Sequence, residues 1–219
     1  MARLLFEKTG NAVWISHLDL MRLFQRAFKR ADLPLTHTQG YNPRPLVSIA
    51  LPLSVGVASH CELLDFDLDS TNLPMEIIMS RLNGALIDGV KVLQVYPNGR
   101  KIKDLALLRS VITLEYDRGV PVGAAEGLRA LFDARTLTVP KKTKNGVREQ
   151  DIIPMIKELA VIQSSANEIT IDLLACCQNP TLNPLQLVAA INLYATQFAP
   201  DFAKCSRLEI YDAHKTVFR

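Results

Sequence analysis

The sequence predicts an α+β protein built from two βαββαβ halves, each an antiparallel sheet with two helices packed on one face. The hydrophobic periodicity of the first half has the order strand, helix, strand, strand, helix, strand. The same order recurs about 105 residues later along the chain. Two such units are typical of ferredoxin-like halves, which we expect at 1–98 and 108–219. One irregular α+β domain is the alternative, because the duplication rests on element order and not on residue identity.

The first half begins with a strand and ends with one. Loose alternation rich in Leu and Phe predicts a strand at 2–8 that continues at 11–15 after a turn at Gly10. A capped helix follows and must end before Pro34. A second helix is expected to open at Asn72. The remaining strands of this half are expected at 46–57, 61–68 and 90–96.

The capped helix is the strongest helix signal of the chain. Ser16 followed three residues later by Asp19 is typical of a helix start, because such side chains satisfy free backbone N–H groups. At about 100° per residue, one side of the helix is apolar; it carries Met21, Phe24, Ala27, Phe28 and Ala31. The other side carries four cations, Arg22, Arg26, Lys29 and Arg30. We expect the apolar side to be buried and the basic side to face outward.

This basic side is the best candidate for a binding surface. Phosphate recognition needs exposed cations at helical-turn spacing, and a guanidinium can donate two hydrogen bonds to one phosphate. The first 45 residues carry seven Lys or Arg against three Asp or Glu, whereas the net charge of the whole chain is only +3. The pattern therefore predicts a local nucleic-acid contact or, as the alternative, a solvated charged face.

The connection G-Y-N-P-R-P forms a second candidate surface. Gly40 allows backbone to come close to a ligand, Tyr41 can stack on a base and Asn42 can read a base edge. Arg44 adds a cation. The same residues suit a rigid turn, because Asn and Gly accept left-handed backbone and proline fixes φ. Both interpretations stay open.

Two titratable residues are further candidates. His17 precedes the basic helix and is the first candidate for a general acid or base; a packing or hydrogen-bonding role is the alternative. Glu62 shares the predicted inward face of its strand with Leu64 and Phe66. A carboxylate there needs a partner, for which we expect Arg44 or His17, unless Glu62 marks the exposed end of the strand.

The second half repeats the pattern around a hairpin. Its strands are expected at 110–117, 136–142, 168–175 and 205–211, and its helices at 122–134 and 183–198. Asn145-Gly146 is a strong hairpin signal, and 151–159 either extends that hairpin or forms a short turn. Basic residues near the hairpin tip are candidates for a nucleic-acid backbone contact, although charged tips also serve solubility alone; they are Lys141, Lys142 and Lys144.

Composition excludes several classes of protein. The chain of 219 residues is 48% hydrophobic, which is ample for buried cores. Its four cysteines form no C-x-x-C or C-x-x-x-C-x-x-C pattern, so we expect free thiols, no metal and no cofactor. Motifs of nucleotide-binding phosphate loops, zinc hydrolases and serine hydrolases are absent from the sequence. No signal peptide or long apolar stretch occurs, which predicts a cytoplasmic protein without membrane contact.

Three blocks resemble the signature of the DUF2344 family of radical-SAM-linked proteins: S-H-L-D-L-M-R, R-A-F-K-R-A-D-L-P and Q-G-Y-N-P-R-P-L-V-S-I-A. Later blocks are S-x-x-E at 59–62, R-L-N at 81–83, D-G-V at 88–90 and R-E-Q-D-I-I-P at 148–154. The resemblance implies the signature positions Ser16, His17, Asp19, Gly40, Asn42, Pro43, Glu62, Asp65 and Asp151. One departure is Arg44, where the family usually has His, which puts any role of a neutral imidazole there in doubt.

Members of that family are fused to radical SAM proteins or encoded beside them, near ribonuclease E/G and ribosomal-protein genes. The resemblance therefore implies a non-catalytic RNA-binding protein that partners a radical SAM enzyme in tRNA or rRNA modification or processing. One alternative is a metal-independent RNA endonuclease of double ferredoxin-like fold with His17 in its active site. Another is a scaffold whose basic face docks the radical SAM partner.

Overall fold

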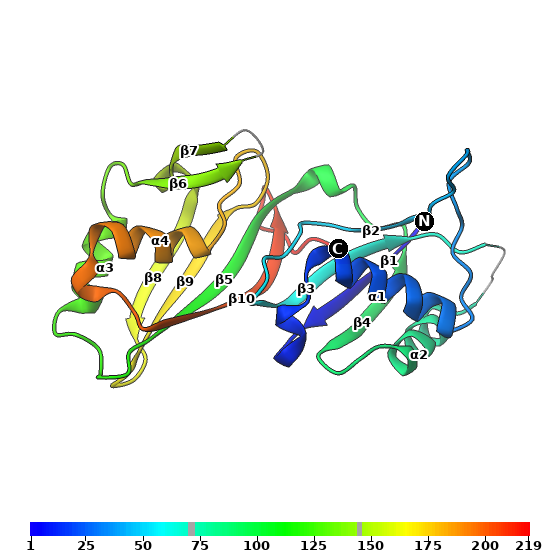
Figure 1. Ribbon diagram of the computed structural model, residues 1–219. Helices are drawn as coiled ribbons and strands as arrows, with labels where there is room; N and C mark the ends of the chain where they lie inside the picture. The colour runs from blue at the N-terminus through cyan, green and yellow to red at the C-terminus, as the bar shows by residue number, and fades with distance from the viewer. Residues whose placement is uncertain (70–72, 144–145) are drawn as a thin grey trace. The chain divides into compact units, whose positions relative to one another are not determined.

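The structure is a computed structural model that describes residues 1–69, 73–143 and 146–219 (Figure 1). The chain divides into two compact units. The first unit contains Met1–Asp104 together with Val217–Arg219, and the second contains Leu105–Thr216. The end of the chain therefore belongs to the same unit as its beginning, which element order alone did not indicate.

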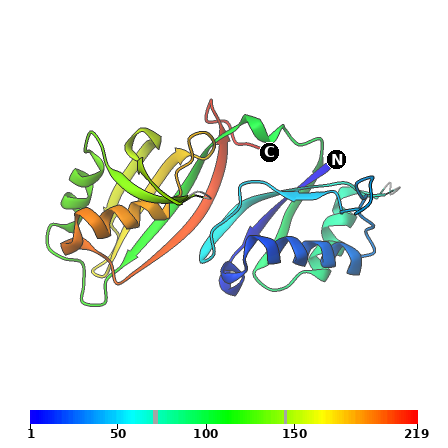
Figure 2. The same cartoon turned by 45° about the horizontal axis from the view of Figure 1, so that its top comes forward.

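The first unit has the predicted βαββαβ order. Its elements are β1 (Ala2–Lys8), the 3₁₀ helix η1 (Gly10–Trp14), α1 (His17–Arg30), β2 (Val47–Ile49), β3 (Val57–Phe66), α2 (Met75–Ala85), β4 (Val90–Pro97) and the 3₁₀ helix η2 (Ile102–Asp104). The strands lie in the order β4-β1-β3-β2, and each neighbouring pair is antiparallel. Helices α1 and α2 contact each other and lie on one face of this sheet (Figure 2). The α+β class and the ferredoxin-like arrangement of this half are confirmed.

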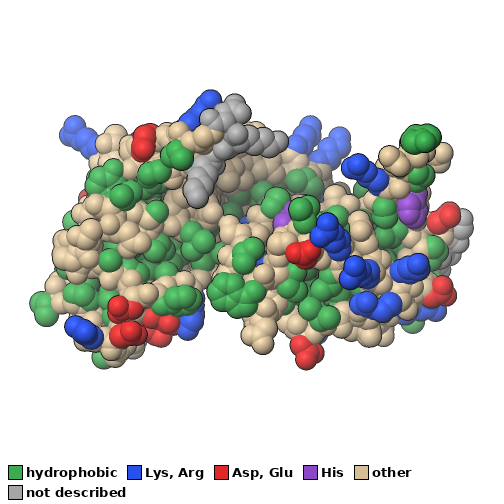
Figure 3. Space-filling model, viewed as in Figure 1, with side chains coloured by type: hydrophobic (Ala, Val, Ile, Leu, Met, Phe, Trp, Pro, Cys, Tyr) green, Lys and Arg blue, Asp and Glu red, His purple; other side chains and the backbone are tan. Residues whose placement is uncertain are grey.

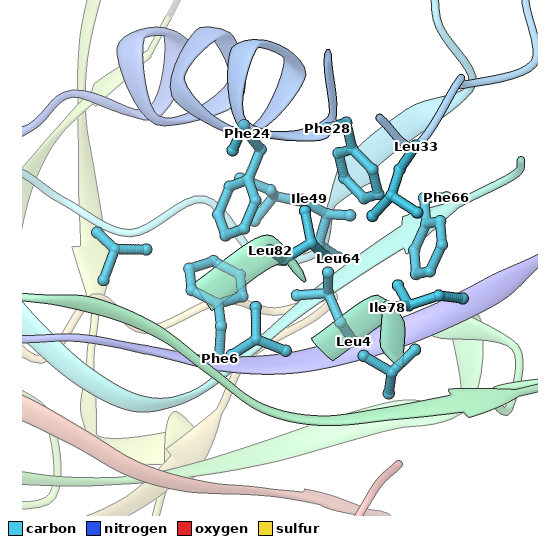
Figure 4. Packing of buried hydrophobic residues seen from close by; sticks show 14 of the residues in the cluster. Leu4, Phe6, Phe24, Phe28, Leu33, Ile49, Leu64, Phe66, Ile78 and Leu82 are labelled. Carbon is cyan, nitrogen blue, oxygen red and sulfur yellow. The ribbon is translucent and has the colours of Figure 1, made fainter. Parts of the chain in front are cut away.

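The core of the first unit lies between this sheet and its two helices. Alternate residues of β1 and β3 point toward the helices and meet side chains of α1 and α2, as Figure 4 shows for Leu4, Phe6, Phe24, Phe28, Leu64, Phe66, Ile78 and Leu82. The rings of Phe6 and Phe24 meet edge to face with their centroids 4.7 Å apart. On α1, Phe24, Ala27 and Phe28 are fully buried. The predicted apolar side of the helix is therefore confirmed.

The predicted start of α1 is confirmed as well. Ser16 is the N-cap residue, and its Oγ accepts the backbone N–H of Asp19 at 3.2 Å. The Ser16 hydroxyl also donates to Oδ2 of Asp19 at 2.7 Å. The predicted start of the second helix at Asn72 lies outside the described residues, and the described helix begins at Met75.

Two strands predicted for the first half are wrong in part. Residues 11–15 do not continue β1, because Gly10 has a φ of +54° and the chain turns into η1. Of the strand predicted at 46–57, only the three residues of β2 pair with β3. Leu51 then takes a φ of +48°, and Pro52 has no N–H to donate to a neighbouring strand. The chain therefore leaves the sheet after β2.

The second unit repeats the order with one insertion. Its elements are β5 (Leu105–Glu115), α3 (Ala124–Phe132), β6 (Thr138–Thr143), β7 (Gly146–Asp151), the 3₁₀ helix η3 (Ile153–Met155), β8 (Ile156–Gln163), β9 (Glu168–Cys176), α4 (Leu185–Tyr194), the 3₁₀ helix η4 (Thr196–Phe198) and β10 (Phe202–Asp212). The strands of its main sheet lie in the antiparallel order β10-β5-β9-β8. Helices α3 and α4 contact each other, and α3 packs on β8 (Figure 2).

The second strand of this sheet is β8 and not the strand predicted at 136–142. That segment forms β6, which pairs with β7 in a separate hairpin. The hairpin predicted from Asn145-Gly146 is thus present, although Asn145 itself lies outside the described residues. Residues 151–159, expected to extend the hairpin or to turn, contain η3 and the start of β8. Only Val161 of β8 is fully buried, so this strand leaves a weak hydrophobic pattern in the sequence.

Candidate nucleic-acid interface

The four cations predicted to face outward are exposed on α1: Arg22, Arg26, Lys29 and Arg30. Figure 3 shows Lys and Arg side chains gathered over this helix. Two of them are held by neighbours. Arg22 Nη1 donates to Oδ1 of Asp19 at 2.9 Å, and Arg30 Nη2 donates to the carbonyl oxygen of Ala85 at 2.5 Å. Arg26 and Lys29 make no hydrogen bond or ion pair within the described part of the chain.

Asp19 links the cap of α1 to its basic side. The hydroxyl of Ser16 and, next, the guanidinium of Arg22 hold the pKa of the Asp19 carboxyl below its usual value. Asp19 therefore stays ionised at neutral pH and orients Arg22. One negative charge is set against four positive ones on this surface, so the helix keeps a positive excess.

Two grooves flank the basic helix. The first has a volume of about 490 Å³ and combines a cationic wall with an apolar floor; its lining includes Arg22, Arg26, Arg30, Ile15, Leu23 and Ile87. The second has a volume of about 350 Å³ and includes Gln25, Lys29, Leu33, His37 and Pro45. Lys29 thus shares a groove with the base of the segment that carries the second candidate surface. The structure brings the two surfaces predicted from the sequence next to each other.

That second surface is an arm formed by residues 36–46. The Thr38 N–H donates to the carbonyl of Arg44 at 2.8 Å, and the Arg44 N–H donates to Oγ1 of Thr38 at 3.0 Å. At the tip, Gly40 has a φ of +134°, a conformation that other residues rarely adopt. Tyr41 is fully exposed, and Asn42 and Arg44 are exposed beside it. The arm presents an aromatic ring, an amide and a cation to solvent.

The basic hairpin of the second unit presents fewer exposed cations, among the described residues, than the sequence predicted. Lys141 is half-buried, and its Nζ donates to the carbonyl oxygen of Thr181 at 3.2 Å. Lys144 and the side chain of Lys142 lie outside the described residues. The hairpin is anchored by Asp151, whose Oδ1 accepts the N–H groups of Leu137 and Ile153 at 2.9 and 3.1 Å. This gives a structural role to a signature residue for which the sequence indicated none.

His17 is the first residue of α1 and is half-buried. Its Nδ1 is buried and has no hydrogen-bond partner within the described residues. A general base for RNA cleavage must reach the proton that it abstracts, and a buried Nδ1 at the base of the helix does not favour that role. His17 lies at the foot of the basic surface rather than on it.

Glu62 is buried on the inward face of β3, as its position in the strand predicted. The structure provides Lys8 of β1 as its charged partner, while the expected partner Arg44 is exposed in the arm. Lys8 is only 1% exposed, and its Nζ donates to the carbonyl oxygens of Val13 and Ile15 at 3.1 and 2.8 Å. Burial lowers the pKa of Lys8, and the charge of Glu62 opposes this shift. Lys8 thereby fixes the turn that leads into α1.

The sequence analysis missed Lys8, although a signal was present. Leu4, Phe6 and Lys8 alternate along β1 and therefore share its inward face. The signature residue Asp65 also has a structural partner: Arg3 donates to both of its carboxylate oxygens, at 2.6 and 3.0 Å. Of the two signature carboxylates on β3, Asp65 thus forms an ion pair with Arg3, and Glu62 lies close enough to Lys8 for its charge to influence the pKa of Lys8.

The cysteines are free in the structure, as expected. Burial raises the pKa of Cys177 and that of Cys205 to about 12, so both stay protonated thiols at neutral pH. Among the described residues, no helix has both the length and the apolar character needed to cross a membrane.

Several solved structures resemble the chain in fold. The crystal structure of a Cbf5-Nop10-Gar1 complex matches with a TM-score of 0.52 and 7% identity, over 95% of this chain and 48% of that chain. An H/ACA RNP bound to a substrate RNA matches with a TM-score of 0.47, and the archaeal box H/ACA sRNP Nop10-Cbf5 complex with 0.46; each is 7% identical over 94% of this chain and 46% of that chain. The chain thus spans about half the length of each of these three chains. At 7% identity the first likeness shows an α+β fold alone.

No curated protein matches the chain. The sequence matches a family described as an uncharacterized protein conserved in bacteria over residues 2–184. This range includes the capped basic helix, the arm and the paired carboxylates Glu62 and Asp65. The chain therefore belongs to the DUF2344 family.

Proposed function

We propose that the protein binds RNA through the basic side of α1 and the adjoining arm, as a non-catalytic partner of a radical SAM enzyme. The observation that carries the RNA proposal is the exposed row of four cations between two grooves, one of which also includes the base of the arm that exposes Tyr41. Guanidinium groups at this spacing match successive phosphates. An exposed aromatic ring provides a stacking platform for an unpaired base.

The shape of the surface favours single-stranded RNA. Duplex RNA is recognised mainly by its shape and by contacts to its 2′-hydroxyl and phosphate groups, whereas unpaired bases can be splayed out and contacted beside the backbone. The groove lined by Ile15, Leu23 and Ile87 offers an apolar floor next to three arginines. A phosphate on the arginines places the attached sugar and base over that floor.

The radical SAM partner and the tRNA or rRNA substrate rest on the family resemblance. The proposal needs the partner because the chain carries no cluster-binding cysteine motif of its own. His17 has no catalytic role in this proposal. A protein-docking role for the same basic side remains one outcome of the test.

The test is a salt titration of RNA binding. Wild type is compared with Arg22→Ala/Arg26→Ala/Arg30→Ala, using total cellular RNA and an unstructured oligonucleotide. Each phosphate contact adds about 0.7 to the log–log salt slope for single strands. The triple variant should therefore lose about 2 units of slope and bind more weakly at every salt concentration.

The matched control is Lys91→Ala/Lys103→Ala/Lys157→Ala, which removes the same charge from exposed positions that do not belong to α1 or line its grooves. It should keep most of the wild-type slope. An equal loss in both variants would mean that only net charge matters. If wild type binds no RNA at low salt but binds a protein from a cell extract in a salt-sensitive way, this surface is assigned to protein docking.

A further inference from the structure

The groove on the arm side of α1 has a floor that belongs to the core of the first unit. Phe28 and Leu33 both line this groove, and both are buried in the cluster that Figure 4 shows around Phe66. The ring centroids of Phe28 and Phe66 lie 5.0 Å apart. Leu35 lines the groove as well and is also buried. Because these side chains are packed in the core, the floor is apolar and is formed before any ligand binds.

The wall that faces α1 is held by backbone contacts at two points. Leu35 forms an antiparallel bridge with Leu68, which follows β3, and His37 forms one with Pro45 across the base of the arm. The first contact ties this wall to the sheet, and the second closes the arm above it. The groove of about 350 Å³ therefore lies between a helix and a fixed connection, and its volume is typical of small-ligand sites.

Three polar side chains line this groove together with the apolar residues. Gln25 and Lys29 come from α1, and His37 comes from the base of the arm. Lys29 and His37 are exposed, and Gln25 is half-buried. Across the described ranges of the chain, none of these three side chains makes a hydrogen bond or an ion pair. An apolar floor with available donors and acceptors above it fits a flat ring that has polar edges.

We propose that this groove holds one unpaired base of the RNA bound along α1, an inference that rests on the proposed RNA-binding function. Lys29 links the two, because it belongs to the row of four cations and also lines the groove. With the Lys29 ammonium on a phosphate, the attached base lies beside the apolar floor. The Gln25 amide can donate to and accept from one base edge at the same time, and His37 offers an aromatic ring for stacking. An apolar peptide side chain would use the floor but neither the amide nor the cation.

The test separates base contacts from phosphate contacts. Fluorescence anisotropy compares a short single-stranded RNA with a fully abasic chain of the same length, in which hydrogen replaces every base. Both probes carry the same phosphates, so the ratio of their affinities reports on base contacts. Wild type should bind the RNA at least about tenfold more tightly than the abasic chain.

The variants should divide these contacts between residues. Gln25→Leu should lower the affinity ratio by about threefold, and Gln25→Leu/His37→Ala by about tenfold, with a salt slope close to that of wild type. Lys29→Ala should do the reverse: it lowers the salt slope by about 0.7 for both probes and leaves the affinity ratio close to that of wild type. Gln94→Leu is the matched control, since it makes the same substitution at an exposed position of β4 that lines neither groove.

The outcomes distinguish this base site from the RNA surface as a whole. Suppose that wild type binds RNA and that Arg22→Ala/Arg26→Ala/Arg30→Ala loses salt slope, but Gln25→Leu/His37→Ala keeps the wild-type affinity ratio. The base site is then overturned while the RNA surface stands. A fall of the ratio in Gln94→Leu as large as in Gln25→Leu overturns the base site too. Absence of RNA binding by wild type overturns both proposals.

Discussion

The two units contain the same kind of ion pair in corresponding strands but bury it differently. In the first unit Arg3 of β1 pairs with Asp65 of β3, and in the second unit Arg109 of β5 pairs with Asp172 of β9. These are the first and third strands of each βαββαβ motif. Arg3 is 3% exposed beneath Phe218, whereas Arg109 is 43% exposed. The arginine of this Arg–Asp ion pair is therefore buried in the first unit and largely exposed in the second.

The inward faces of these strands differ even more. The first unit buries Lys8 and Glu62 between its sheet and α1, while no charged residue of β5 or β9 is buried. In the second unit Leu114 and Ile169 face each other and are fully buried. A buried charge pair adds little stability compared with apolar residues of similar size. In the first unit Lys8 serves to position the backbone, because its hydrogen bonds to Val13 and Ile15 hold the turn that leads into the basic helix.

Among substitutions that test this difference between the units, Lys8→Met should have the largest effect on stability. The substitution removes the positive charge that lies near buried Glu62 and removes the donor from two backbone carbonyls. We expect the free energy of unfolding of the first unit to fall by about 3–5 kcal/mol. Urea denaturation followed by the fluorescence of Trp14, the one tryptophan of the sequence, reports on this unit.

The control for that change is Lys8→Met/Glu62→Leu. This double variant makes these positions of β1 and β3 apolar, like the facing Leu114 and Ile169 of β5 and β9, and should recover most of the lost stability. Its RNA binding should nevertheless stay weaker than that of wild type, because the turn before α1 is no longer held. A single variant that loses less than about 1 kcal/mol would contradict the assignment of Lys8 and Glu62 as a buried pair.

A smaller effect should separate the two ion pairs of the sheets. Arg3→Met leaves Asp65 facing an apolar side chain and should cost about 2–3 kcal/mol, because removal of one partner from a buried pair is poorly compensated. Arg109→Met removes an exposed pair and should cost less than about 1 kcal/mol. Both are measured by urea denaturation, with circular dichroism for the second unit. Equal losses in the free energy of unfolding would show that the burial of Arg3 beneath Phe218 does not strengthen its ion pair with Asp65.

Strong local patterns made much of the fold predictable from the sequence. Ser16 and Asp19 identified the start of α1, the apolar side of that helix identified its packing face, and Asn145-Gly146 identified the hairpin. Elements with little burial were not predictable. Strand β8 contains one fully buried residue, so its alternation was too weak to separate it from the preceding hairpin.

The side-chain partners of residues on neighbouring strands were also not predictable from the sequence. The sequence placed Glu62 on an inward face, but its partner depends on the register between β1 and β3, which are separated by a helix and a long connection. The cations of α1 were identified, because helical spacing is a local property. The groove that Lys29 shares with the arm arises from tertiary packing and leaves no pattern in the sequence.

The smallest expected effect concerns alkaline pH and again differs between the units. Burial raises the pKa of Tyr116 in the second unit to about 12 from 10.0, and its hydroxyl donates to the carbonyl of Phe198 at 3.0 Å. The unfolded tyrosine ionises first, so the stabilisation is complete below pH 10 and is lost as the pH rises through 12. The loss should be about 1 kcal/mol between pH 10 and pH 11.

Lys8 acts in the opposite direction in the first unit. Burial lowers its pKa from the usual 10.5, so the folded state gives up the Lys8 proton more readily than the unfolded state does. The contribution of Lys8 to stability therefore rises as the pH approaches 10.5. Urea denaturation between pH 9 and pH 11 should show a loss of stability in the second unit, to which Cys177 and Cys205 also contribute because burial raises their pKa to about 12. Tyr116→Phe should remove the part due to the tyrosine, about 1 kcal/mol between pH 10 and pH 11. In a Tyr96→Phe background, which removes the opposing loss caused by the raised pKa of Tyr96, it should also show a gain in the first unit that Lys8→Met abolishes. A common slope for both units, unchanged by either substitution, would mean that neither buried group controls the alkaline response.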